Sequence, residues 1–168
     1  MDDLIVRQTT LGQYRAGMDM LGQAIDLCPE ELWLSTDYQN RFWHLAYHSL
    51  FYVHFYLQPS EAEFKPWAKH RPDSQYLGPR PWAKDQPFQL PAPYSKPDVQ
   101  EYLALCRDEV EKQIAVVCFE VSSGFSWLPF NKLGLQLYTI RHLQHHTGQL
   151  IDRLRNVAGI GVGWVGSR

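Results

Sequence analysis

Five of the seven histidines of this chain lie in two short windows, and their spacing is typical of a metal site. His142 and His146 are four residues apart, so on a helix both rings project from one face, one turn apart. Two imidazoles at this spacing can hold one divalent metal ion, and a neighbouring helix can supply a third ligand. His48 is the first candidate for that third ligand, and His44, one turn before it, is the alternative.

The same histidines have a plainer interpretation, in which each is a hydrogen-bonded member of a helical core. One HxxxH pair occurs often by chance and is weak evidence alone. Several histidines on the apolar faces of two helices would each need a polar partner in the core, however. One metal ion would satisfy them together, so we favour a metal site formed by His48, His142 and His146.

Three neutral ligands leave coordination positions open, which is typical of a catalytic rather than a structural site. Such a site can lower the pKa of a bound water or thiol. Zn, Ni and Fe all accept imidazole, so we expect one divalent transition metal per chain without choosing among them. Leu143 stands where an HExxH metalloprotease carries its glutamate base, which excludes that class of enzyme.

Three further residues are candidates for orienting a ligand imidazole: Gln149, Tyr47 and Asp152. Each has an ordinary alternative, respectively an interhelix hydrogen bond, a place in the aromatic core, and a solvated surface position. His145 adjoins His146 but points about 100° away on a helix, so we expect it outside the metal site. No residue is identified as a general base, and the catalytic residues stay unassigned.

Helical spacing of apolar residues predicts the elements that must position these histidines. The first helix is expected over residues 4–25, with Leu4 on its inner face and Pro29 closing it. The second is expected from about Asn40, capped by Asn40 or by Asp37, to Leu57 before Pro59. It is apolar on most sides, so it should lie deep in the fold.

Two more helices follow a long interruption. Ser95 and Asp98 form a cap signature for a third helix with an apolar stripe reaching Val117. The fourth helix is expected over residues 133–157, with Leu137, Ile140, Leu150 and Leu154 on its inner side. No alternating pattern predicts a strand.

Nine of the eleven prolines lie in residues 59–97, which therefore cannot be helical throughout. This stretch also carries large aromatic residues, among them Trp67, Tyr76, Trp82, Phe88 and Tyr94, so we interpret it as an ordered excursion that packs over one end of the helices. Residues 158–168 form a glycine-rich tail. The prediction is one all-α domain over residues 1–168, a four-helix bundle with a proline-rich excursion between its second and third helices.

The segments HLQHHTGQL and FWHLAYHSLFYVHFYL resemble those of the DinB-like (DinB/YfiT) superfamily of metal-binding four-helix bundles. The resemblance covers residues 4–57 and 98–157. It implies that the HxxxH pair, His142 and His146, binds the metal together with His48, or with His44 after a small shift. It also implies homodimers, and chemistry such as transfer or isomerisation that uses a low-molecular-weight thiol. The connection over 59–97 is longer than in the simplest members.

Composition and charge limit the partners and the cellular location that we expect for this protein. The net charge is −2 without any run of basic residues, so we expect no nucleic-acid partner. The N-terminus lacks a signal-peptide layout, no apolar stretch approaches a membrane span, and three widely spaced cysteines suggest reduced thiols, which together indicate a cytoplasmic protein. The working hypothesis is a metal-dependent thiol transferase or hydrolase acting on a small molecule. The alternative is a non-enzymatic bundle that binds a metal or small ligand.

Overall fold

The computed structural model describes residues 3–80 and 82–166, and this part of the chain is all-helical, as predicted. Of the predicted segments, residues 1–2, Pro81 and 167–168 lie outside the described residues. The elements are α1 (Asp3–Leu27), α2 (Glu30–Leu34), α3 (Phe42–Leu57), a 3-10 turn η1 (Glu61–Glu63), α4 (Lys96–Val116), α5 (Lys132–Arg153) and a π-helical turn η2 (Leu154–Ala158).

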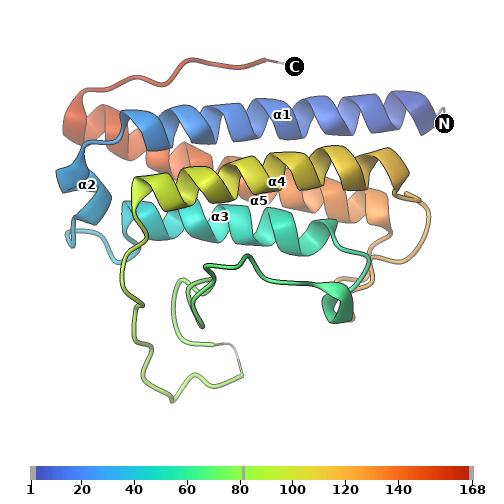
Figure 1. Ribbon diagram of the computed structural model, residues 1–168, viewed down its shortest axis with the longest axis horizontal. Coiled ribbons are helices and arrows are strands. Elements are labelled where there is room, and N and C mark those ends of the chain that lie inside the picture. The colour runs from blue at the N-terminus through green and yellow to red at the C-terminus, as the bar shows by residue number, and fades with distance from the viewer. Residues whose placement is uncertain (1–2, 81, 167–168) are drawn as a thin grey trace.

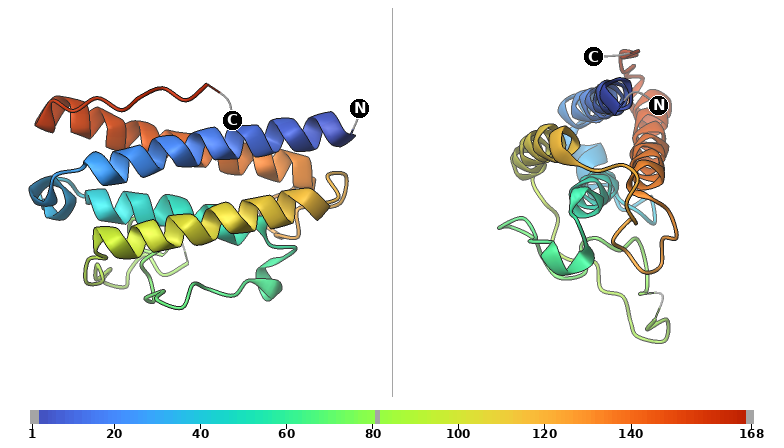
Figure 2. Two further views of the ribbon diagram at one scale, coloured as in Figure 1. Left: turned by 45° about the horizontal axis from the view of Figure 1, so that its top comes forward. Right: turned by 90° about the vertical axis from the view of Figure 1, so that its right-hand side faces the viewer.

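The four long helices lie side by side, with α1 and α3 each packed against both α4 and α5 (Figures 1 and 2). Helices α3 and α4 run in the same direction, opposite to α1 and α5 (Figure 1). A link between two parallel neighbours must travel the length of a helix, so the chain needs a long crossover between α3 and α4. None of the described helices combines the length and apolar character that crossing a membrane requires.

The core is centred on α3 and is largely aromatic. Tyr47 stacks on Tyr94 and Tyr102, with ring centroids 4.5 and 5.4 Å apart, and Trp67 stacks on Tyr102 at 4.7 Å. Trp67 and Tyr94 belong to the proline-rich crossover, and both are buried. This crossover therefore contributes side chains to the core in addition to linking two helices.

Several predicted helix ends are confirmed or corrected. The Ser95 hydroxyl accepts a hydrogen bond from the Asp98 amide at 3.2 Å, which is the predicted cap of α4. Helix α3 begins at Phe42 instead of Asn40, and neither Asp37 nor Asn40 caps it. The Asp37 carboxylate instead accepts from Ser35, because the chain between α2 and α3 turns there.

Two apolar residues predicted to face inward are exposed. Leu4 is 59% exposed because it lies in the first turn of α1, and Leu137 is 60% exposed on α5. The short helix α2 was not predicted. Its five residues are too few to show a period, and Pro29, interpreted only as the end of α1, is also the N-cap of α2.

The relative placement of α3 and α5 is held by contacts at the C-terminus of α3. The buried Lys132 ammonium donates to the carbonyl oxygens of Gln58 and Pro59, at 2.8 and 2.9 Å. Gly124 has φ +83°, and a Cβ there would lie 2.0 Å from the Pro59 oxygen, so only glycine fits this approach. These contacts anchor the start of α5 and thereby set which of its faces meets α3.

Candidate metal centre

Three histidines from two helices meet between α3 and α5. His48 lies on α3, whereas His142 and His146 lie one turn apart on α5. The Nε2 atom of His142 is 3.0 Å from Nε2 of His48 and 3.2 Å from Nε2 of His146. One ligand nitrogen from each of the three lies within 4.8 Å of the others, so the group could hold a metal ion.

The outer nitrogens of two of these rings are held by acceptors. His48 Nδ1 is 2.7 Å from the carbonyl oxygen of Gln75, and His146 Nδ1 is 2.8 Å from Oε1 of Gln149. A carbonyl oxygen can only accept a hydrogen bond, so each Nδ1 carries the proton and each Nε2 presents a lone pair. Both lone pairs point toward His142.

No tautomer of His142 satisfies this arrangement. Its Nδ1 is buried and has no hydrogen-bond partner among the described residues, while its Nε2 faces two lone pairs. One proton on Nε2 leaves Nδ1 an orphaned acceptor, and a proton on Nδ1 leaves three lone pairs facing one another. A tetrahedral ion with bonds of about 2.0–2.1 Å separates its ligand nitrogens by about 3.3 Å, close to the spacing seen here. The residues therefore fit a metal ion.

The electrostatics keep the three rings neutral. Burial, followed by the neighbouring His146, lowers the pKa of His142 to about 4. Burial and the other two imidazoles hold the pKa of His48 well below its usual range, and burial also lowers the pKa of His146. Neutral imidazole is the form that binds metals, so the site needs no deprotonation at neutral pH.

The group that could hold a metal contains histidines only, and no carboxylate. Three neutral ligands would leave the charge of a divalent ion uncompensated and a coordination position open. The ring of Tyr52 stands edge-on to His48 and His142, with centroids 4.9 and 5.3 Å away. It forms an apolar wall on one side of the cluster.

The structure separates the two candidates on α3. His44 is 1% exposed, and its Nε2 lies 3.0 Å from the Ser74 carbonyl oxygen, so it is outside the three-histidine group. Its ring is stacked against those of Trp43 and Phe88. His145 is exposed, as expected for a residue outside the site.

Of the three residues considered as orienting partners, only Gln149 contacts a candidate ligand. The Tyr47 hydroxyl lies 2.6 Å from Nδ1 of His70 within the aromatic core, and Asp152 is exposed and accepts from Asn156. Sequence reasoning missed Gln75, because its contribution is a backbone carbonyl, for which residue type gives no signal.

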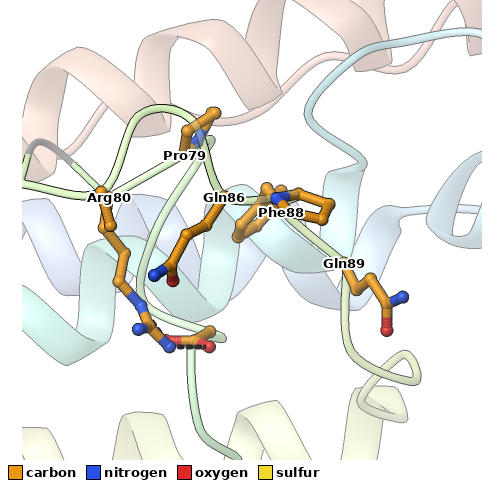
Figure 3. A pocket seen from close by; sticks show the side chains of 8 residues that line it. Pro79, Arg80, Gln86, Phe88 and Gln89 are labelled. Carbon is orange, nitrogen blue, oxygen red and sulfur yellow. Dashed lines mark hydrogen bonds and ion pairs between the residues drawn. The ribbon is translucent and has the colours of Figure 1, made fainter.

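The described hollows lie away from the three histidines. A cavity of about 50 Å³ lies within the crossover, where Pro79, Gln86 and Phe88 line it (Figure 3). Two larger hollows, of about 310 and 500 Å³, border α1 and α4 and contain none of the three histidines. His48 and His146 are buried and His142 is partly exposed, with Tyr52 beside the cluster.

Comparison of the chain with protein-family models, with curated proteins and with solved structures produced no match. These comparisons neither support nor contradict the resemblance to the DinB-like superfamily, which stays a prediction from the segments HLQHHTGQL and FWHLAYHSLFYVHFYL.

Proposed function

We propose that this chain is a four-helix bundle of the DinB-like type that binds one divalent transition metal through His48, His142 and His146. The observation that carries the proposal is the meeting of three neutral imidazoles, in which the Nε2 atom of His142 lies 3.0 Å from that of His48 and 3.2 Å from that of His146. With His48 and His146 protonated on Nδ1, at most one proton is available among the three Nε2 atoms, so their lone pairs cannot all find a donor, whereas a shared cation accepts one lone pair from each Nε2. The proline-rich crossover would then cover the bundle beside the site.

We further propose a metal-dependent enzyme of the thiol transferase or hydrolase type, acting on a small molecule. A divalent metal on three neutral ligands lowers the pKa of a thiol or water that reaches it, and a low-molecular-weight thiol is the expected co-substrate. The chain's own residues orient the ligands, through the Gln149 side chain and the Gln75 carbonyl, and Tyr52 limits the access of water.

One observation favours a second candidate, a non-enzymatic bundle that binds a metal or small ligand. His48 and His146 are buried, and none of the three hollows described above is lined by a histidine of the cluster. In that case the ion would stabilise the contact between α3 and α5.

Elemental analysis of protein purified without a histidine tag tests the metal site. We expect about one transition metal per chain in the wild type, and loss of the metal in His142→Ala and in His146→Ala. His145→Ala is the matched control, because His145 adjoins the pair but is exposed, and it should retain the metal. Absence of metal from the wild type, even after incubation with zinc or nickel, would refute the proposal.

Turnover assays separate the two candidate functions. Metal-loaded protein would be supplied with a small thiol and generic electrophiles, and separately with simple esters and amides. Thiol- or water-dependent turnover that is absent from His142→Ala supports the enzyme. A fully loaded protein that turns over none of these substrates supports the binding protein instead.

A further inference from the structure

A tight turn in the crossover, residues 71–76, lies directly against α3 beside the candidate metal centre. Its consecutive carbonyl groups, those of Ser74 and Gln75, face His44 Nε2 at 3.0 Å and His48 Nδ1 at 2.7 Å. His44 and His48 are one helical turn apart, so two adjacent carbonyls match two imidazoles on one stripe of α3. The candidate ligand and the histidine before it are thus held by the same piece of backbone.

The conformation of this turn depends on Asp73. Among the described residues it is the only one other than glycine with a positive φ, at 68°. Its carbonyl oxygen accepts from the Tyr76 amide at 3.1 Å, and its carboxylate forms a two-point ion pair with Arg80, with one N–O distance of 2.9 Å. Aspartate tolerates the left-handed region better than most residues, and the ion pair holds it there.

The start of the turn is anchored independently of Asp73. The Arg71 amide donates to the Tyr94 hydroxyl at 2.8 Å, and the Arg71 side chain donates to the carbonyl oxygens of Ala92 and Pro93. The turn is thus tied to the buried Tyr94 at one end and to Arg80 further along. This arrangement is more than a loop needs in order to connect two helices.

We propose that the turn 71–76 is the positioning element of the metal centre, in which His44 and Asp73 act through the Gln75 carbonyl to orient His48. In this arrangement His44 is not an alternative metal ligand. By donating to the Ser74 carbonyl oxygen it fixes the position of the adjacent Gln75 carbonyl, to which His48 Nδ1 donates. Groups that accept from the outer nitrogen of a metal-bound histidine set its tautomer and ring orientation, and their loss typically weakens metal binding by about 10–100-fold. The inference rests on the proposed metal site.

The test compares Asp73→Val with Asp73→Gly. Both variants lose the carboxylate and its pair with Arg80, but glycine adopts a positive φ freely, whereas a β-branched residue resists it. We expect zinc to bind Asp73→Val about tenfold more weakly than Asp73→Gly, as measured by competition with a chromophoric chelator. The visible absorption of the cobalt-loaded proteins should also differ, which a change in stability alone would not produce. Equal zinc affinities of the two variants would overturn the proposal.

A second pair of variants tests the other end of the arrangement and does not depend on the folding of Asp73→Val. His44→Phe removes the donor to Ser74 and should weaken zinc binding by about tenfold, the lower end of the range for such partners. His54→Phe is its control, because His54 is also buried on α3 but lies 3.2 Å from the Tyr102 hydroxyl, away from the turn. Equal zinc affinity of these two variants would count against positioning by His44.

Failure of this inference is distinguishable from failure of the metal site. If the wild type binds neither zinc nor cobalt, the proposed function fails. If the wild type binds zinc and the two Asp73 variants bind it equally, the turn has no positioning role; if only the His44 and His54 variants bind it equally, His44 takes no part in positioning.

Discussion

Replacing His142 with leucine tests the metal site through its effect on protein stability, because in the metal-free protein the nitrogens of the three histidines cannot all form hydrogen bonds. His142 Nδ1 is buried without a partner, and its Nε2 faces two nitrogens that both present lone pairs. A buried polar atom without a hydrogen bond costs about 1–3 kcal/mol, whereas a made hydrogen bond contributes about 0.5–1.5 kcal/mol. Leucine removes the unsatisfied Nδ1, but it also removes the Nε2 donor and so leaves one more buried Nε2, that of His48 or His146, without a hydrogen bond; the two changes nearly offset. We therefore expect the free energy of unfolding of metal-free His142→Leu to lie within about 1 kcal/mol of that of the metal-free wild type.

Zinc should make the wild type the more stable of the two proteins. A ligand that binds only the folded state at 100 times its Kd stabilises by about 2.7 kcal/mol. The wild type should gain that stabilisation, and His142→Leu should gain almost none, because it loses one of three ligands. In a domain of this size each kcal/mol shifts Tm by about 2–4 °C.

The assay is urea unfolding of both proteins, once with a chelator and once with excess zinc. The reasoning predicts similar stabilities of the two proteins in chelator and a more stable wild type in zinc. If His142→Leu is instead less stable than the wild type in chelator by more than about 2 kcal/mol, His142 is an ordinary, hydrogen-bonded core residue. If zinc stabilises both proteins equally, the ion binds elsewhere.

Three other outcomes follow from the structure. Burial lowers the pKa of His44 from 6.5 to about 4, so between these values the unfolded chain binds a proton that the folded chain does not. The free energy of unfolding of metal-free protein should therefore fall by about 3 kcal/mol from this residue as the pH drops from 6.5 to 4, measurable by urea unfolding across that range. Gln149→Leu should weaken zinc binding by about 10–100-fold in a chelator competition, while Asp152→Ala, on the exposed side, should leave it unchanged. Gly124→Ala should lower the thermal midpoint sharply, because its Cβ would lie 2.0 Å from a backbone oxygen, whereas Gly148→Ala, with open space around it on α5, should raise stability by about 0.5–1 kcal/mol.

The helices could be predicted because their signals are local. Apolar spacing located the four long helices, and the Ser95 cap identified the start of α4, since a cap depends on residues only three apart. The same method placed Leu4 and Leu137 in the core, and both are exposed. Periodicity reports the average direction of a helix face, but it does not report where the neighbouring helix ends or turns away.

The candidate site could be predicted only as far as helix geometry reaches. The pairing of His142 with His146 follows from the 3.6-residue period alone. The choice between His44 and His48 does not, because both lie on one stripe of α3, and a segment without any periodic pattern separates their roles. That segment contacts them through the carbonyls of Ser74 and Gln75, and every residue type carries such a group. Its placement depends on tertiary contacts such as the pair of Asp73 with Arg80.

The parallel course of α3 and α4 affects which parts of such a protein can vary in length and sequence during evolution. A crossover along the 16-residue α3 has to span about 24 Å, which about eight extended residues could do, whereas residues 58–95 provide several times that length. Closing a loop of about 40 residues instead of eight costs only about 1.5 kcal/mol of additional chain entropy. Insertions and deletions in the crossover therefore change the free energy of folding little, whereas the histidines on α3 and α5 are constrained by helix packing. Natural variation in this crossover could change what reaches the site without altering the helices that form it.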